Sequence, residues 1–451
     1  MADTLLDVLA GHRRAGRGDR PALIDRRRSV TYAELEGEVG ARAGELRAAG
    51  IGPGVRVGAV LTTLLDSVVD FAAATSLHAA VLVLQEAAGA AERSAALADF
   101  GAELVLDGEV LTRLRPTTAA GGRDPAFAMA SSGTSGRPKV ISREWAGTLH
   151  NSAAFARTLG LDADDTVLTT SPLGHSYAIE AGTLAVLTAG ACQLIPAGPL
   201  TPARAALLVE RHRPTVLQSV PLILDWWGRG DVPRAGTWKR CVSAGEGLPE
   251  RAAEPWREAG LTVYDHYGNS ELGQLTLNAA GGNGGVGHPL PGVRIKAGNG
   301  EPGPVEAAFP GLSPVRMEGG HAVPLADADG WVTTGDLGVL DDDGLWLTGR
   351  SDLLINIGGN KVSPVEVEAV LRTLPGVRDC AVVGRPGPSG DNQVWAFVEA
   401  GADEFDAAAL RRRAREQLMT VKVPTVFRRV DALPRTGSGK IRRGLLIEDG
   451  D

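Results

Sequence analysis

Apolar positions near the start of the chain follow a helical spacing. The segment Thr31–Glu34 has the form of a capping box, and the apolar residues from Leu35 to Leu46 recur on one helical face. Gly50 follows as a terminator. The pattern predicts a helix over residues 32–49.

Short apolar runs, bounded by glycine, proline and polar clusters, predict buried strands further along the chain. The runs are Val55–Leu61, Val81–Leu84, Leu104–Leu106, Val167–Thr170, Val216–Val220 and Leu261–Tyr264. Ala-rich helical stretches separate these runs. Such alternation is typical of an α/β fold in which helices cover parallel sheets.

The character of the sequence changes twice after this region. Glycine-rich text over residues 281–330 indicates irregular or β-rich structure. Beyond Asp352, an N-cap serine, an N1 proline and an N3 glutamate at Ser363–Glu366 predict a helix over residues 364–373. Further predicted elements are strands at Cys380–Val383, Val394–Val398 and Thr425–Val430 and a helix at Ala407–Leu418. We therefore expect a large N-terminal domain over residues 1–351 and a smaller α+β domain over residues 352–451.

Composition narrows the class of protein. The 451 residues allow about three structural units at roughly 150 residues each. Lys and Arg number 46 against 54 Asp and Glu, a net charge of −8, with 43% hydrophobic residues. This balance is typical of a soluble globular enzyme and argues against nucleic acid or an acidic membrane as a partner. No run of about 18 apolar residues and no secretory leader occur, so we expect a cytoplasmic protein.

The three cysteines, Cys192, Cys241 and Cys380, have neither CxxC nor zinc-ligand spacing. We interpret them as buried thiols of a reducing compartment.

The densest chemical signal is the segment Ser131–Lys139, which holds two glycines, four hydroxyls and a lysine directly after an apolar run. Such a composition suits a phosphate, because glycines turn backbone N–H groups toward an anion and the lysine adds a point charge. It is not a Walker A loop. An ordinary Gly/Ser turn would have the same composition, so the segment needs support from elsewhere.

That support comes from a second lysine set in glycine and serine, at Pro434–Arg443, where Lys440 follows Gly-Ser-Gly. Alone, it would be interpreted as a basic surface hairpin. Two such lysines in different predicted domains instead suggest a phosphate site approached from two sides, with chemistry that depends on the presence of the second lysine.

Between these lysines, Tyr267–Glu271 offers a stacking ring, a glycine for close approach and oxygens for Mg²⁺. Asp336 adds a carboxylate able to bind two ribose hydroxyls, and Arg350 adds a forked cation. Each fragment alone is a common turn.

Taken in order, the segments Ser131–Lys139, Tyr267–Glu271, Thr334–Asp336, Gly349–Asp352 and Pro434–Lys440 resemble the motifs of the adenylate-forming superfamily. This superfamily includes acyl- and aryl-CoA synthetases, adenylation domains of peptide synthetases and firefly luciferase. The similarity covers residues 20–443. It implies a large N-terminal domain of sheets and helices, a mobile C-terminal lid and a hinge at Asp352.

The resemblance also implies a reaction in two steps. A carboxylate attacks the α-phosphorus of Mg·ATP and expels pyrophosphate, and a thiol of coenzyme A or of a carrier-protein phosphopantetheine then attacks the acyl-adenylate. The nucleotide and metal residues implied are Ser131, Ser132, Gly133, Thr134, Ser135, Gly136 and Lys139 for the phosphates, Tyr267, Gly268, Ser270, Gly245 and Glu246 around the adenine, Asp336 and Arg350 near the ribose, and Glu271 with Thr134 for Mg²⁺. Lys440 would bridge the carboxylate and the α-phosphate in the first step, and Gly358 and Gly359 would line the thiol tunnel in the second.

The segment Pro172–Glu180 is similar to the stretch that lines the acyl pocket in aryl- and acyl-activating members, so His175, Tyr177 and Glu180 are candidate pocket residues, with Ser243 and Gly268. No aspartate follows Asp165 before Asp225 to pair an α-ammonium, which disfavours an ordinary α-amino acid. The role of each of these three side chains stays open. His175 and Tyr177 would each either line the pocket or have an ordinary structural role. Glu180 would either face the pocket or bond a neighbouring backbone group or arginine.

The acceptor also stays open, because a compact member of the family suits a dedicated acyl or peptidyl carrier protein as well as coenzyme A. A member that adenylates an amino-bearing acid for such a carrier, a luciferase-like fate of the adenylate and a non-catalytic nucleotide-binding relative are the remaining alternatives. The last is disfavoured, because Lys440 and Glu271 are both present.

Overall fold

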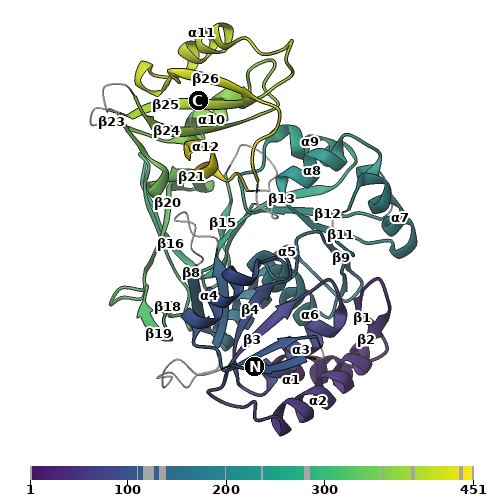
Figure 1. Ribbon diagram of the computed structural model, residues 1–451. Coiled ribbons are helices and arrows are strands. Elements are labelled where there is room, and N and C mark those ends of the chain that lie inside the picture. Colours follow the sequence, from purple (N-terminus) through teal and green to yellow (C-terminus); the bar gives the residue numbers. More distant parts are fainter. Residues whose placement is uncertain are drawn as a thin grey trace. The chain divides into compact units, whose positions relative to one another are not determined.

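The computed structural model describes residues 3–108, 110–114, 126–131, 139–198, 200–234, 237–278, 285–357, 360–387, 392–435 and 440–448 (Figure 1). The chain divides into two compact units. The first unit comprises Met1–Ile295 and Glu306–Val332, and the second comprises Lys296–Val305 and Thr333–Asp451. Each unit is described by itself.

The first unit contains two large sheets. One has the strand order β15 (His288–Pro289), β14 (Gly273–Asn278), β13 (Thr262–Asn269), β12 (Arg240–Ala244), β11 (Val216–Ser219), β9 (Thr166–Thr169), β10 (Cys192–Leu194), β1 (Pro21–Ile24) and β2 (Ser29–Thr31). The other has the order β19 (His321–Pro324), β18 (Val315–Glu318), β8 (Lys139–Glu144), β7 (Ala126–Ser131), β4 (Ala80–Gln85), β3 (Arg56–Leu61), β5 (Leu104–Asp107) and β6 (Val110–Arg113). Both sheets have parallel strands at their centre and antiparallel strands at their edges.

Helices connect these strands. They are α1 (Leu5–His12), α2 (Tyr32–Ala48), α3 (Leu65–Ser76), α4 (Ala90–Phe100), α5 (Trp145–Leu159), α6 (Ala185–Ala189), α7 (Pro202–His212), α8 (Pro221–Gly228) and α9 (Glu250–Glu258). The π-helical turns η1 (Arg13–Arg17) and η2 (Tyr177–Leu184) and the 3₁₀ turn η3 (Val232–Arg234) complete the unit.

Three smaller sheets lie wholly or mainly in the second unit. Their strands are β16 (Arg294–Lys296), β17 (Gly303–Ala308), β20 (Val332–Asp341) and β21 (Gly344–Arg350), then β22 (Ile355–Ile357) with β23 (Asn360–Val362), then β24 (Asp379–Pro386), β25 (Asn392–Glu399) and β26 (Val426–Val430). Its helices are α10 (Pro364–Arg372), α11 (Ala407–Gln417) and α12 (Arg443–Glu448), with 3₁₀ turns η4 (Ser351–Leu353) and η5 (Thr420–Lys422).

The local signals that predicted the first helix are confirmed in α2. The hydroxyl of Thr31 accepts a hydrogen bond from the Glu34 N–H at 3.2 Å, and the Glu34 carboxylate accepts one from the Thr31 N–H at 2.8 Å. Leu35, Val39 and Leu46 are buried, as their helical spacing requires. The predicted α/β class and each predicted strand are also confirmed, with ends that differ by a few residues.

The predicted N-cap at Ser363 is confirmed in position, and the end of one predicted strand needed correction. Ser363 stands at the N-cap of α10, but its side chain makes no capping bond and instead donates to the Thr348 carbonyl at 2.9 Å. The strand predicted to end at Tyr264 continues to Asn269, because its antiparallel pairing with β14 extends to Asn269 and Gly273. Backbone pairing carries that strand past the end of its apolar run.

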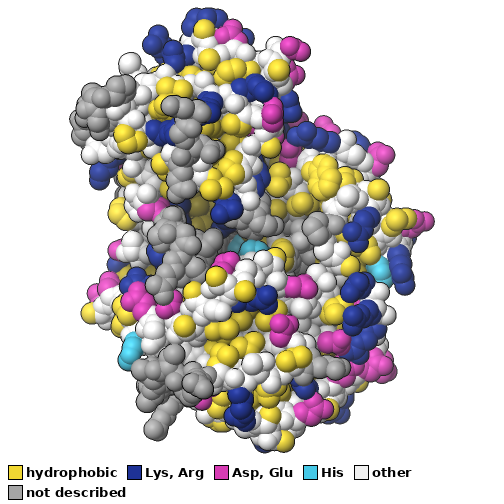
Figure 2. Space-filling model, viewed as in Figure 1, with side chains coloured by type: hydrophobic (Ala, Val, Ile, Leu, Met, Phe, Trp, Pro, Cys, Tyr) yellow, Lys and Arg dark blue, Asp and Glu magenta, His cyan; other side chains and the backbone are white. Residues whose placement is uncertain are grey.

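The burial of the cysteines and the distribution of charged side chains agree with the composition. All three cysteines are buried and free, as predicted, and burial raises the pKa of Cys192 to about 12. On the face drawn in Figure 2, Lys and Arg side chains are interspersed with Asp and Glu side chains. In the described part of the chain, no helix is both long enough and apolar enough to cross a bilayer.

Candidate active site

The carboxyl edge of the first sheet gathers three of the predicted motifs. Strands β9, β11, β12 and β13 are parallel neighbours, so their carboxyl ends meet at one edge. The segment Pro172–Glu180 follows β9, Gly245 and Glu246 follow β12, and Tyr267–Glu271 closes β13. The structure therefore brings together, within one unit, the residues predicted for adenine and for the acid.

The turn from β13 into β14 is built around a glycine at which a side chain would collide with the backbone. A Cβ on Gly268 would lie 2.5 Å from the Gly273 carbonyl oxygen. Asn269 then closes the turn, because its Oδ1 accepts a hydrogen bond from the Leu272 N–H at 2.8 Å. The tight turn fixes the backbone that carries Ser270 and Glu271.

Gln85 links the second sheet of this unit to the predicted acyl segment. Ser131 and Lys139, the two ends of the predicted phosphate segment, face each other across the β7–β8 hairpin. Gln85 is the last residue of β4, the parallel neighbour of β7. Its side-chain amide is hydrogen-bonded to Nδ1 of His175 at 3.2 Å. The predicted acyl segment and the ends of the predicted phosphate segment thus come from adjoining strand ends.

Several predicted residues lie outside the described part of the chain. They are Ser132, Gly133, Thr134, Ser135 and Gly136 of the phosphate segment and Gly358 and Gly359 of the predicted thiol tunnel. Their roles remain predictions.

Glu180 does not present an isolated anion. It is fully buried and forms an ion pair with the buried Arg143 of β8. Ser176 donates a hydrogen bond to its Oε1 at 2.6 Å, and the Gln274 side-chain amide lies 3.5 Å from its Oε2. Of the alternatives left open by the sequence, bonding to an arginine is the one found.

The Arg143–Glu180 pair belongs to a larger buried network. The Asn151 side chain of α5 donates to the Gln274 carbonyl and accepts from the Gln274 N–H, each at 2.8 Å. A Cβ on Gly273 would lie 2.6 Å from Asn151 Oδ1, 2.7 Å from Arg143 Nη1 and 2.8 Å from Glu180 Oε2. Glycine at 273 lets β8, α5, η2 and β14 close around this polar core.

Tyr177 and His266 form an aromatic wall next to the network. The Tyr177 hydroxyl donates to the Val242 carbonyl at 3.1 Å, and its ring stacks on His266 with centroids 5.7 Å apart. Phe155 of α5 meets the other side of His266 edge-on at 5.0 Å. Burial lowers the pKa of His266 to about 3, so this imidazole is neutral near pH 7.

Asp265, next to His266 in β13, is also perturbed. Burial raises the pKa of Asp265 to about 7, although hydrogen bonds from the backbone N–H groups of Leu248 and His266 act in the opposite direction. A carboxyl group that is half protonated near neutral pH therefore lies beside the predicted adenine residues.

The second unit brings together three other predicted residues. Asp336 and Arg350 are register partners in β20 and β21, and Arg350 Nη1 lies 3.3 Å from an Asp336 carboxylate oxygen. The same guanidinium donates from Nε to Asp352 at 2.9 Å. The predicted ribose carboxylate and the predicted hinge aspartate thus share one cation.

Lys440 is placed by its flanking residues. Arg435 and Ile441 form an antiparallel bridge, and the Arg442 N–H donates to the Pro434 carbonyl at 2.8 Å. Ile441 also packs against a small apolar cluster that includes Leu433 and Leu446. The backbone next to Lys440 is therefore tied to the body of the second unit.

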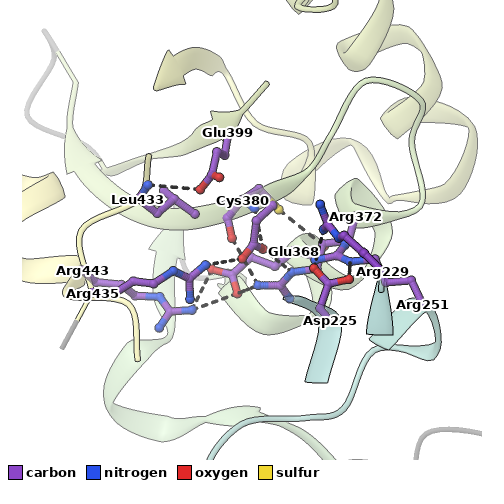
Figure 3. A network of polar contacts seen from close by, with 11 residues as sticks. Asp225, Arg229, Arg251, Glu368, Arg372, Cys380, Glu399, Leu433, Arg435 and Arg443 are labelled. Carbon is purple, nitrogen blue, oxygen red and sulfur yellow. Dashed lines mark hydrogen bonds and ion pairs between the residues drawn. The ribbon is translucent and has the colours of Figure 1, made fainter. Parts of the chain in front are cut away.

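Two arginines that flank the lysine segment bind one buried and one partly buried carboxylate (Figure 3). Arg443 donates from Nη2 to both oxygens of Glu368 at 2.8 Å, and the Val382 N–H donates to Glu368 Oε1 at 2.7 Å. Arg435 pairs with Asp379, which Arg372 also contacts at 2.8 Å. The lysine segment is thus held at both ends by ion pairs.

Motif spacing gave no sign of Arg143, Gln274, Asn151 or His266. The one usable signal is that Glu180 is a lone charge in an otherwise apolar stretch, and a buried charge requires a partner. Among the described residues, no cluster of three or more His, Cys, Asp and Glu side chains could hold a metal ion by itself.

Comparison with known proteins agrees with this geometry. The family model for AMP-binding enzymes matches residues 11–120 and 107–311, and the model for their C-terminal domain matches residues 366–440. The 3-hydroxybenzoate–CoA ligase of Aromatoleum sp. (strain CIB) is 29% identical and aligns over 96% of this chain and 94% of its own length. The feruloyl-CoA synthase of Amycolatopsis sp. is 30% identical over 92% and 93%.

A carrier-protein relative and a solved structure extend the comparison. The 3,4-dihydroxybenzoate–[aryl-carrier protein] ligase of Bacillus anthracis is 29% identical over 72% of this chain and 74% of its own length. The fold matches that of the anthranilate CoA ligase AuaEII with a TM-score of 0.82, at 23% identity, over 98% of this chain and 96% of that chain.

The chain therefore belongs to the AMP-binding enzyme family, the adenylate-forming enzymes that the motifs resemble. Its predicted class is confirmed. It is a ligase that activates a carboxylic acid as an acyl-adenylate and then forms a thioester.

Removing the Arg443 guanidinium should destabilise the second unit. Arg443→Met leaves the buried Glu368 carboxylate with weaker compensation, so we expect the free energy of unfolding to fall by about 1–3 kcal/mol. The exposed neighbour in the variant Arg442→Met is the matched control and should change stability by less than about 0.5 kcal/mol. Denaturant unfolding of both variants measures this, and equal effects would contradict the assigned contact.

The raised pKa of Asp265 predicts a pH-dependent stability. Because the folded state favours the protonated carboxyl, its stabilising contribution is complete below about pH 4 and is lost as the pH rises through 7. The stability of the wild type relative to Asp265→Asn should therefore fall by roughly 1–3 kcal/mol between pH 4 and pH 8. Unfolding curves across that range test this, with exposed Asp329→Asn as control. A difference independent of pH would contradict it.

Proposed function

We propose that this ligase activates an aromatic carboxylic acid with ATP and transfers the aroyl group to coenzyme A, with release of AMP. The observation that carries the proposal is the meeting of three motifs, Pro172–Glu180, Gly245–Glu246 and Tyr267–Glu271, at one sheet edge of the first unit. The 3-hydroxybenzoate–CoA ligase and feruloyl-CoA synthase relatives support an aromatic acid and coenzyme A.

In the first step, a substrate carboxylate oxygen attacks the α-phosphorus of ATP, the new C–O–P linkage forms, and pyrophosphate leaves. Tyr267 with Gly245 and Glu246 would hold the adenine, and the segment Ser131–Lys139 would hold the outer phosphates. The fixed turn at Gly268 and the neutral, stacked His266 provide a rigid, partly dry wall for the acid.

Glu271 fits a magnesium ion that is shared with the nucleotide. Mg²⁺ is usually held by one or two carboxylates together with substrate phosphates, and Glu271 stands on the turn next to the adenine residues. When bound, the ion would neutralise charge on the phosphates. Thr134 is the second proposed metal residue.

The second unit would contribute the groups that act on the ribose and the α-phosphate. Asp336, oriented by Arg350, would bind the ribose hydroxyls, and Lys440 would bridge the acid and the α-phosphate. We propose that residues 352–451 act as a mobile lid that turns at Asp352. In the second step, this lid would withdraw Lys440 and bring Gly358 and Gly359 to the thiol tunnel.

A carrier protein is the alternative acceptor, and the aryl-carrier-protein ligase relative favours keeping it. The distinguishing experiment measures acid-dependent pyrophosphate release with and without coenzyme A. Sustained turnover only with coenzyme A supports the proposal. A reaction that stops after one turnover even when coenzyme A is present indicates a carrier-bound phosphopantetheine as the acceptor. The absence of pyrophosphate release with every aromatic acid would contradict the proposed chemistry.

Lys440→Ala should separate the two steps. We expect adenylation to slow by about 10²–10³-fold, as for the loss of one fixed charge-stabilising donor, while thiol attack on supplied acyl-adenylate changes much less. Pyrophosphate exchange and single-turnover thioester formation measure the two steps. Lys422→Ala, which removes a lysine paired with Glu366 in the same unit, is the matched control. Equal losses in both steps would exclude this role for Lys440.

A further inference from the structure

His266 contacts two residues that the sequence assigns to the acid pocket. Its ring stacks on Tyr177 at 5.7 Å, and its Cε1 lies 3.2 Å from the position that a Cβ on Gly268 would occupy. His266 stands in none of the motifs, because it precedes the Tyr267–Glu271 segment. If the pocket lies where the motifs place it, His266 is part of its wall.

The imidazole of His266 is buried without hydrogen bonds. The residue is 4% exposed, and neither ring nitrogen has a partner among the residues that the structure describes. Buried polar groups are bonded in the great majority of cases, because an unpaired one forfeits its hydration. The neutral ring has one donor nitrogen and one acceptor nitrogen. It suits a small group that both donates and accepts.

A second unpaired group lies on the neighbouring strand β14. Gln274 is the register partner of Gly268, and the register of the two strands shifts between Tyr267 and Gly268. Gln274 is 2% exposed, and its Oε1 has no partner in the described part of the chain, while its backbone is fixed by Asn151. Strands β13 and β14 thus offer His266 and an amide acceptor whose backbone is fixed.

The surroundings of His266 are aromatic. Phe155 and Tyr177 flank the imidazole, and the buried charges of Arg143 and Glu180 form an ion pair. An aromatic ring fits between such walls.

We propose that His266 recognises a hydroxyl or amino substituent on the ring of the acid, so that the enzyme selects hydroxy- or amino-substituted aromatic acids over unsubstituted benzoate and alkyl acids. This inference rests on the proposed function, which identifies the site as an aryl-acid ligase. His266 would determine which acid is selected. The groups that act on the reacting atoms remain those named under the proposed function.

The first test needs only the wild-type enzyme. Acid-dependent pyrophosphate exchange is measured with benzoate, its three hydroxy and three amino isomers, and hexanoate. We expect at least one hydroxy or amino isomer to exceed benzoate by about 10–100-fold in kcat/KM, because benzoate leaves the imidazole unpaired. The isomer that is preferred distinguishes a hydroxyl from an amine. Benzoate or hexanoate used as well as every substituted acid would overturn the inference, since water would then satisfy His266.

The second test removes the two nitrogens. His266→Leu should reduce the preference for the substituted acid to within about threefold, through a loss of kcat/KM for that acid and an unchanged or higher value for benzoate. His266→Gln, which keeps a donor and an acceptor, should retain part of the preference. His288→Leu makes the same change at an exposed histidine of the same unit and should leave the preference intact.

Thermal unfolding checks that each variant is folded, and the wild-type series decides the question if His266→Leu is not. A folded His266→Leu enzyme that keeps the full preference would overturn the role of His266. Failure of the proposed function has a different signature, because then no aromatic acid would support pyrophosphate exchange in any variant.

Discussion

The part of the first unit that we propose binds the acid depends on one buried ion pair. Arg143 comes from the second sheet and Glu180 from the turn η2, and both are almost completely enclosed. Two charges in such a place are tolerated because they pair with each other and because Ser176 and Gln274 supply further bonds to Glu180. The pair fixes η2 against β8, and η2 in turn carries Tyr177 to the wall of the proposed pocket.

The second unit follows the same principle. Glu368 and Asp379 are buried or nearly so, and the arginines that compensate them are the residues that flank the lysine segment (Figure 3). A single catalytic lysine on a glycine-rich segment would lose much side-chain and backbone freedom when it binds a nucleotide. In the role proposed for Lys440, the ion pairs that hold Arg435 and Arg443 reduce this cost, because they fix residues on either side of the lysine before the nucleotide binds.

Much of this organisation could be predicted from the sequence, for identifiable reasons. The capping box at Thr31 and the apolar runs of the central strands act locally, so they predicted α2 and the sheets correctly. The order of glycine-rich and charged motifs predicted the family. The partner of Glu180 could not be predicted, because Arg143 is 37 positions away and only the packing of β8 against η2 makes them neighbours. His266 was also missed, because the sequence cannot show that both of its ring nitrogens lack hydrogen-bond partners among the described residues.

The three cysteines carry a consequence for an enzyme of this chemistry. An acyl-adenylate is a mixed anhydride that acylates any accessible thiolate, including the enzyme's own. Here every native sulfhydryl is buried, and burial raises the pKa of both Cys192 and Cys241. The protein is thereby shielded from self-modification by its own intermediate. The same shielding makes the native chain a clean background for site-directed spin or fluorophore attachment, in which an engineered surface cysteine would report on motion of either unit without competing labels.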